Sequence, residues 1–469
     1  MKKNFTKLFS ALLLATMTII GYTVNAQTLA STPVVAAAAS KNEAIGDPKT
    51  EAKIDSAAKA EAVVEKKQKA AETDTAWHPQ RRLWGYAFGD EYYDAHADAT
   101  NRGPETMYNG VPTYRNAFQF RRIYLGYDYE ITKKFKAEVL LASEPNANTG
   151  VNGSTSIQNG DNLVDGKMAF WIKNFNLRTR DLWTGTDLVV GEMSTPSFAL
   201  NEPGTNGPTS LSETTWGYRS IEKTITDFHK NNSYDVGAAL QGTFDPSTKN
   251  FGYVFMVGNN STSSLLSAGS ANTGFYKMYY GVLWAKLFDQ HLFVDIYADG
   301  ARTSASTATV PGGKHNMFKI FASYSTKPIT IGVEAYTQTL ANAIDNTTVT
   351  GSPVYQNATA QGLSLWVKGP IVKNLNYFLR RDGYNPYTDF NQTQSYSSTF
   401  NTNYGNYTAF YKEVFYTGGL DYNPTKNVHF MPNFWLVDYK DQRATSSSSY
   451  VGNDHTLVLR ATFFYTFGK

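Results

Sequence analysis

The stretch HTLVLRATFFYTF, at His455 to Phe467 near the end of the chain, decides the fold. Apolar residues fill one set of alternate positions: Leu457, Leu459, Ala461, Phe463, Tyr465 and Phe467. The other set contains Thr456, Arg460, Thr462 and Thr466. Because successive side chains of a β-strand point to opposite faces, the pattern predicts a strand with one apolar and one polar face. Such a strand can separate lipid from water in a membrane barrel, or a core from solvent in a soluble sandwich.

The same alternation recurs throughout residues 77–469, in short runs separated by polar connections. It is clearest at 123–131, 292–298 and 329–335, where the face opposite the apolar one carries charges. About sixteen strands are expected. Their ranges are 83–92, 118–131, 134–141, 167–178, 186–193, 234–244, 251–257, 276–287, 291–298, 314–325, 329–339, 362–369, 374–382, 407–422, 426–439 and 455–467.

The connections between these strands alternate between short and long. Seven are short and rich in Pro, Asn, Asp, Gly or Lys, and eight are long and rich in Asn, Ser, Thr and Gly. With an even strand number and both chain ends on the short-link side, this pattern is typical of an outer-membrane barrel. A soluble β-sandwich would need two facing apolar layers and would not show this regular alternation of link length. We therefore predict an all-β fold, a transmembrane antiparallel β-barrel.

The composition of the 469-residue chain excludes several other classes. It contains no Cys, so neither a disulfide framework nor a thiolate metal site is expected. Its net charge of +3 gives no reason to expect a nucleic-acid partner. A mean hydropathy of −0.39 with 18% charged residues does not fit a bundle of transmembrane helices. An aromatic content of 14%, led by Tyr, suits a large β-protein in contact with two environments.

Two segments precede the barrel. Residues 1–26 contain Lys2, Lys3 and Lys7, then an apolar run and small residues before Gln27, which predicts a secretory signal peptide. Residues 27–76 are rich in Ala, Lys and Glu and lack aromatic residues, which predicts a periplasmic linker or a short helix. A coiled coil or a cell-wall tether is the alternative, although the apolar stripe of such a helix is narrow.

The third long connection, residues 194–233, is the candidate constriction of a pore. A barrel of about sixteen strands is wide enough for an aqueous lumen unless something fills it. Within the connection, the helix-compatible residues 219–230 carry charges of alternating sign, among them Arg219, Glu222, Lys223 and Asp227. The connection either folds into the lumen, where its charges set the local field, or caps the barrel from outside.

Three stretches resemble the family of phosphate-selective porins O and P. They are FRRIYLGYDYEITKKFKAEVLLASE at 120–144, LVVGEMSTPSFALNEP at 188–203 and YRSIEKTITDFHKNNSYDVGAALQG at 218–242. Within them, the motifs at 121–122, 191–196, 222–224 and 235–242 occur in the order found in the family. The order and spacing of these motifs carry the resemblance, which covers residues 83–242 and extends to the rest by strand pattern. It implies a sixteen-stranded homotrimeric porin in the outer membrane of a Gram-negative bacterium, with the third connection folded inward.

The residues assigned to the pore wall have mixed charges. The basic ones are Arg122, Lys136, Lys319, Arg380 and Arg460, and the acidic ones are Asp128, Glu130, Glu138, Asp235, Asp295 and Glu334. Members of the family that are specialised for phosphate line their channel with Arg and Lys. The sequence therefore predicts passage of small hydrophilic solutes or ions, and leaves a preference for anions such as phosphate open.

Other functions find little support in the sequence. The seven His residues are scattered, so no catalytic triad is indicated, and no local His, Asp and Glu spacing predicts a structural metal site. We expect no enzyme activity and no cofactor. The expected partners are outer-membrane lipid, small ions or solutes, and further copies of the chain in a homotrimer, but no nucleic acid. The alternative is a non-conducting barrel that acts as a scaffold in an envelope assembly or secretion complex.

Overall fold

The computed structural model describes residues 78–100, 102, 108, 111–143, 163–164, 167–168, 170–199, 224–228, 233–260, 276–306, 311–347, 353–394, 396 and 409–468. The predicted signal peptide, residues 1–26, and the segment 27–76 lie outside the described residues, so both remain predictions. None of the helices described here is long and apolar enough to cross a membrane.

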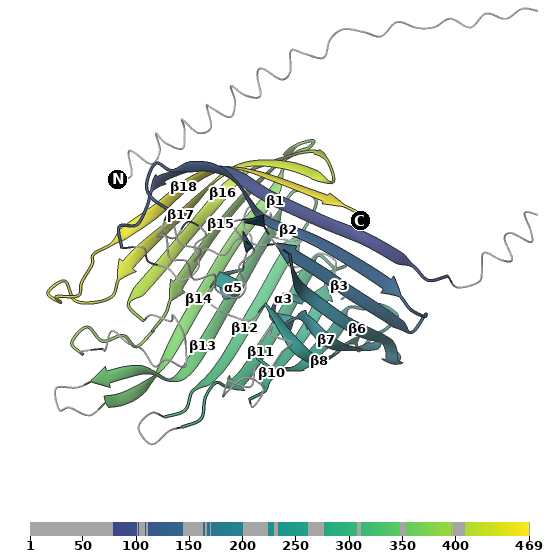
Figure 1. Ribbon diagram of the computed structural model, residues 1–469, viewed down its shortest axis with the longest axis horizontal. Helices are drawn as coiled ribbons and strands as arrows, with labels where there is room; N and C mark the ends of the chain where they lie inside the picture. Colours follow the sequence, from purple (N-terminus) through teal and green to yellow (C-terminus); the bar gives the residue numbers. More distant parts are fainter. Residues whose placement is uncertain are drawn as a thin grey trace, which may run out of the picture. The chain divides into compact units, whose positions relative to one another are not determined.

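Sixteen strands of the described chain form one closed antiparallel barrel (Figure 1). Each pairs with the next along the chain, and β1 pairs with β18 to close the ring. The strands are β1 (Arg81–His96), β2 (Asn116–Glu130), β3 (Phe135–Ser143), β6 (Trp171–Trp183), β7 (Thr186–Ser194), β8 (Tyr234–Thr243), β9 (Phe251–Gly258), β10 (Met278–Leu287), β11 (Leu292–Arg302), β12 (Lys314–Ser325), β13 (Thr330–Thr347), β14 (Pro353–Val372), β15 (Leu375–Asn385), β16 (Tyr411–Thr425), β17 (Val428–Asp441) and β18 (Asp454–Phe467).

Four small elements of the described chain lie in the connections. The strands β4 (Leu163–Val164) and β5 (Lys167–Met168) pair in a separate two-stranded sheet between β3 and β6. The helices α3 (Pro196–Ala199) and α5 (Ile225–Phe228) belong to the third connection, between β7 and β8.

Each of the sixteen predicted strands overlaps one barrel strand, and β12 has the predicted bounds. Most predicted bounds differ from the observed ones by a few residues, and at two places the difference changes the assignment of a whole segment. The barrel strand β6 begins at Trp171, because residues 167–168 form β5 instead. The predicted long connection 340–361 is mostly strand, since β13 and β14 continue past a register shift between Leu340 and Ile344. Both of these side chains are buried in a small apolar cluster with Tyr387, which stabilises the extension.

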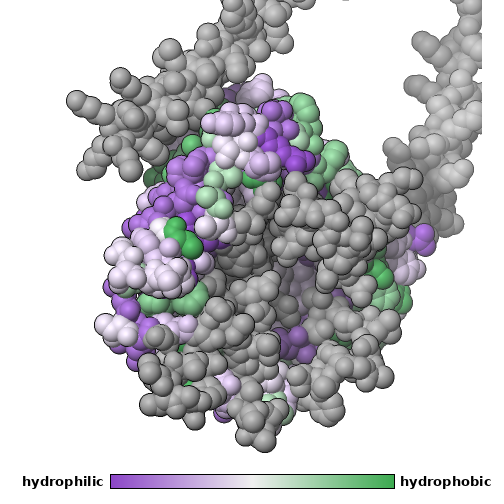
Figure 2. Space-filling model, turned by 60° about the vertical axis from the view of Figure 1, so that its left-hand side comes forward, coloured by the Kyte–Doolittle hydropathy of each residue, from purple (hydrophilic) through white to green (hydrophobic). Residues whose placement is uncertain are grey.

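The burial pattern confirms the predicted facing of the strands. Ile296 is 45% exposed and its neighbour Asp295 is 2% exposed, because the first points out of the barrel and the second into it. Glu334 and Arg460 are likewise buried on the inner face. The outer face is apolar, as contact with lipid requires. Seen from the end with the long connections, the described surface is mainly hydrophilic, and hydrophobic residues lie toward its edges (Figure 2).

The inner face is more aromatic than the sequence predicts. Trp84, Trp284 and Trp366 point into the barrel, each opposite a glycine of the neighbouring strand. The partner of Trp84 is Gly126, where an added Cβ would lie 2.2 Å from the indole ring. The ring thus occupies the space that a side chain at Gly126 would need. Such pairs bury large rings inside the wall without lengthening the distance between strands.

Candidate functional site

The two ends of the third long connection, residues 194–233, lie next to each other where β7 ends and β8 begins. The backbone N–H of Thr195 donates to the carbonyl of Ser233 at 2.9 Å, which joins the two ends of the connection. Just after this point, α3 contacts β9 and β10. Its Ser197 carbonyl accepts a hydrogen bond of 3.0 Å from Nζ of Lys319, on β12.

The second helix of the connection reaches further around the ring. The Thr226 hydroxyl in α5 donates to the Glu334 carboxylate on β13, and α5 also contacts β14. Ile225 is fully buried in the apolar cluster that includes Tyr297 and Phe321 of the inner wall. These contacts lie several strands away from β7 and β8, where the connection starts and ends. The described parts of the connection therefore lie inside the barrel, where Figure 1 draws α3 and α5.

The charges predicted for the constriction are only partly described. Arg219, Glu222 and Lys223 lie outside the described residues. Asp227 belongs to α5, but the placement of its side chain is not described. Their role in a constriction therefore remains a prediction.

The five predicted wall residues all lie on the inner face and are buried: Arg122, Lys136, Lys319, Arg380 and Arg460. Four of them lie in the middle of their strands. Lys136 is the exception, because it is the second residue of β3 and so lies next to a short link. The structure therefore separates Lys136 from the other four along the barrel axis.

Lys136 belongs to a chain of ion pairs along the wall. Its Nζ lies 2.8 Å from Oε1 of Glu138 and 3.4 Å from Oδ2 of Asp128. Glu138 is 3.5 Å from Nε of Arg178, which in turn is 3.2 Å from Asp187. Basic and acidic groups thus alternate across β2, β3, β6 and β7. This arrangement neutralises charge locally, which weakens the field that each group would exert on a passing ion.

Arg460 and Arg122 contact aromatic rings of the inner wall. Nε of Arg460 donates to Oδ1 of Asn433 at 2.9 Å, and its guanidinium carbon lies 4.7 Å from the centre of the Trp435 ring. The guanidinium carbon of Arg122 lies 5.2 Å from the centre of the Tyr124 ring. The rings supply the partial negative charge of their faces to the two guanidinium groups.

The remaining two wall residues also have defined partners. Nε of Arg380 donates to Oδ1 of Asp382 at 2.9 Å, within one strand. Lys319 binds the Ser197 carbonyl of the third connection, as described above. Lys319 therefore joins the wall to the candidate constriction.

Two further charged groups of the interior are not among the wall residues predicted from the sequence. Arg121 forms a fully buried ion pair with Asp90, next to a register shift between β1 and β2. Lys173 lies over the rings of Tyr124 and Tyr234, at 4.9 Å and 4.7 Å from their centres. Register shifts at these two positions interrupt the regular alternation of inward and outward side chains. A prediction that assumes this alternation therefore misses both residues.

Comparison with solved structures identifies the barrel type. No protein-family model matches the chain, and no curated protein matches it. The outer-membrane channel DcaP of Acinetobacter baumannii superposes with a TM-score of 0.52 at 10% identity, over 83% of this chain and 97% of that one. The fold is that of an outer-membrane porin. An anion-selective porin from Comamonas acidovorans gives a TM-score of 0.50 at 11% identity, over 83% of this chain and all of the porin. At such identities the likeness concerns the fold alone.

Proposed function

We propose that the protein is an outer-membrane porin, through which small hydrophilic solutes or ions diffuse passively. The closed barrel, its apolar outer face and its charged inner face support the proposal. We further propose that it is a homotrimer, as the resemblance to the phosphate-selective porins O and P implies. In this proposal residues 27–76 lie in the periplasm.

One observation carries the proposal. The hydrogen bonds from Lys319 to Ser197 and from Thr226 to Glu334 hold the two described ends of the third connection against the inner wall. A connection inside the barrel narrows it, and a narrow opening with charged walls selects solutes by size and charge. We therefore propose that residues 194–233 form the constriction, with Arg219, Glu222, Lys223 and Asp227 as its charges.

The wall charges favour weak selectivity. The described inner face carries basic and acidic groups that pair with one another, such as Lys136 with Glu138 and Arg380 with Asp382. Paired charges exert little net field on a solute. Anions such as phosphate would pass in this proposal, but without a strong preference over cations.

Conductance in planar bilayers tests the proposal. The purified full-length protein should form water-filled channels whose conductance rises with salt concentration, and a salt gradient should give a reversal potential close to zero. A large reversal potential of the anion sign would instead show a preference for anions over cations. If folded protein inserts but never conducts, the porin proposal is wrong, and the scaffold alternative takes its place.

A further inference from the structure

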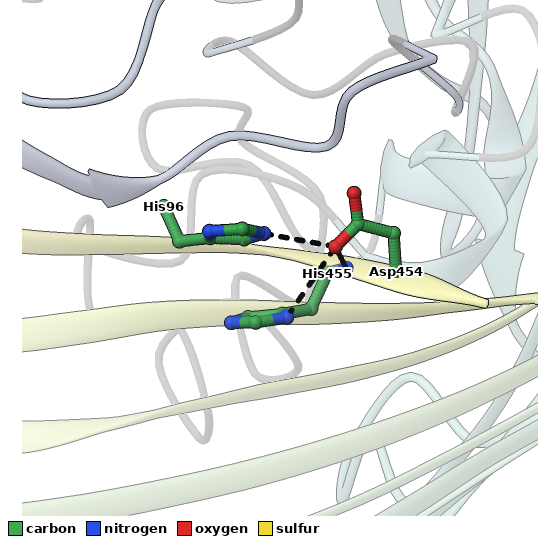
Figure 3. A group of neighbouring side chains, drawn as sticks. All are labelled: His96, Asp454 and His455. Carbon is green, nitrogen blue, oxygen red and sulfur yellow. Dashed lines mark hydrogen bonds and ion pairs between the residues drawn. The ribbon is translucent and has the colours of Figure 1, made fainter.

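Two histidines and one aspartate meet where the barrel closes, at the ends of β1 and β18 that lead into long connections (Figure 3). His96 is the last residue of β1, and Asp454 and His455 are the first two residues of β18. His96 and Asp454 are 358 positions apart in the chain. Local spacing in the sequence therefore gives no sign of the cluster.

The three side chains converge on one carboxylate oxygen. Nε2 of His96 lies 2.8 Å from Oδ1 of Asp454, and Nδ1 of His455 lies 3.7 Å from the same atom. The two imidazole rings stack with their centres 4.1 Å apart and their planes 18° apart, so both present a nitrogen to the same side (Figure 3). Ligands of one Zn²⁺ ion, each at about 2.1 Å, stand roughly 3.0–3.4 Å from one another. The three ligand atoms lie within 4.8 Å of one another, so binding of an ion requires the side chains to draw closer together.

A β-bulge in β1 places His96 in the cluster. The register shifts between Asp94 and His96, so that His96 rather than Ala95 lies opposite Leu457. Leu457 and His455 are two residues apart on β18 and therefore share the outer face. Without the bulge, Ala95 would take the outer position and His96 would point into the barrel. The irregularity thus has a specific effect, which is to bring the two imidazoles together.

The carboxylate of the cluster is held in a fixed orientation. Oδ2 of Asp454 accepts the backbone N–H of Ala99 at 2.9 Å, and Oδ1 accepts the backbone N–H of His455 at 2.8 Å. Such outer hydrogen bonds orient metal-binding carboxylates in known sites. The side chains of His96 and His455 are 40% and 42% exposed, so an ion can enter from solvent.

We propose that His96, Asp454 and His455 bind a divalent transition-metal ion such as Zn²⁺. Two imidazoles and one carboxylate suit Zn²⁺, Cu²⁺ or Ni²⁺, whereas Mg²⁺ and Ca²⁺ prefer oxygen ligands alone. Metal bonds would replace the hydrogen bond between His96 and Asp454, and water would complete the coordination. Because the ligands come from the first and last strands, the ion would cross-link the closing seam of the barrel.

Titration of Zn²⁺ into the folded full-length protein in detergent, after chelator treatment, tests the proposal by calorimetry. We expect one ion per chain, with affinity at least about tenfold lower in His96→Ala and in His455→Ala. His291→Ala is the matched control, because its ring lies at a short link and bonds the Ser325 carbonyl. The control should bind Zn²⁺ like the wild type, and Mg²⁺ should not bind at the site.

A second variant and a second measurement separate metal binding from folding. His96→Gln can still donate a hydrogen bond to Asp454, so it should keep the fold and lose the Zn²⁺ site. Zn²⁺ should raise the unfolding temperature of the wild type but not that of His96→Gln, because an ion that binds only the folded seam stabilises the folded state. If Zn²⁺ does not bind, or binds equally to the wild type and the His96 and His455 variants, the proposal is wrong. Neither result depends on whether the barrel conducts.

Discussion

Leu459 and Leu83 are the same residue type on the same outer face, but they lie at different depths. Leu459 is in the middle of β18, whereas Leu83 is the third residue of β1 and is 57% exposed. We expect Leu459→Arg to lower the free energy of unfolding in lipid by about 2–4 kcal/mol, and Leu83→Arg by about 0–1 kcal/mol. Denaturant titrations of protein refolded into vesicles measure both. Equal losses at the two positions would contradict the assignment of this face to lipid.

Glycines of the barrel strands differ in what surrounds them. A Cβ at Gly126 would lie 2.2 Å from the Trp84 ring, whereas a Cβ at Gly281 would meet nothing within 4 Å. We therefore expect Gly126→Ala to cost about 1–3 kcal/mol of unfolding free energy through overpacking. Gly281→Ala, on the outer face of β10, is the control and should change stability little. Tryptophan fluorescence during denaturant titration measures both, and a neutral Gly126→Ala would mean that the ring moves aside without cost.

Among the elements, the turn between β8 and β9 depends on one carboxylate. Hydrogen bonds from the Thr248 hydroxyl and from the backbone N–H groups of Asn250 and Phe251 hold the pKa of Asp245 below its ordinary value. A lowered pKa contributes stability that is present above the ordinary value, about 3.9, and is lost as the pH falls through the folded value. Asp245→Ala should therefore destabilise the protein at pH 7, and by less near pH 3. Denaturant midpoints at the two pH values test this, and a pH-independent difference would contradict it.

A deletion within the third long connection tests whether residues 194–233 narrow the pore. Removal of residues 205–226 should raise single-channel conductance, because it takes away the segment that is proposed to narrow the barrel, together with the contact of Thr226 with Glu334. A deletion of residues 261–275, in the next long connection, is the control and should change conductance less. Unchanged conductance after the first deletion would mean that residues 194–233 do not limit the pore.

The elements also show what sequence can and cannot reveal. Strand existence and facing were predictable, because the alternation along β18 or β11 is a local property of each stretch. The longer β13 and β14 were not, because Leu340 and Ile344 are buried by Tyr387, from a distant part of the chain. The pairing of Trp84 with Gly126 depends in the same way on register between strands. The position of His96 depends on a bulge that no residue pattern marked.

For the whole molecule, the summed electric field of the charged side chains on the inner face decides which ions pass. Basic groups such as Arg122 and Arg460 lie on the same wall as Asp90 and Glu334, and many of the described charges are paired. A few fixed charges dominate in a narrow opening, because field lines are focused there and salt screens them less than on an open surface. Ion selectivity should therefore respond more strongly to a change of charge in the middle of a strand than to the same change near a strand end.

Charge reversal at two depths tests this expectation. Arg122→Glu and Arg460→Glu, in the middle of β2 and β18, should each shift the reversal potential in a salt gradient toward cations. Lys136→Glu, one residue from the end of β3, should shift it less, because the opening is wider there in the proposed pore and solvent screening is stronger. Circular dichroism must first show that each variant retains its β-structure, since all three side chains are buried. A larger shift from Lys136→Glu than from the other two would place the selective part of the pore at the short-link end, away from the third connection.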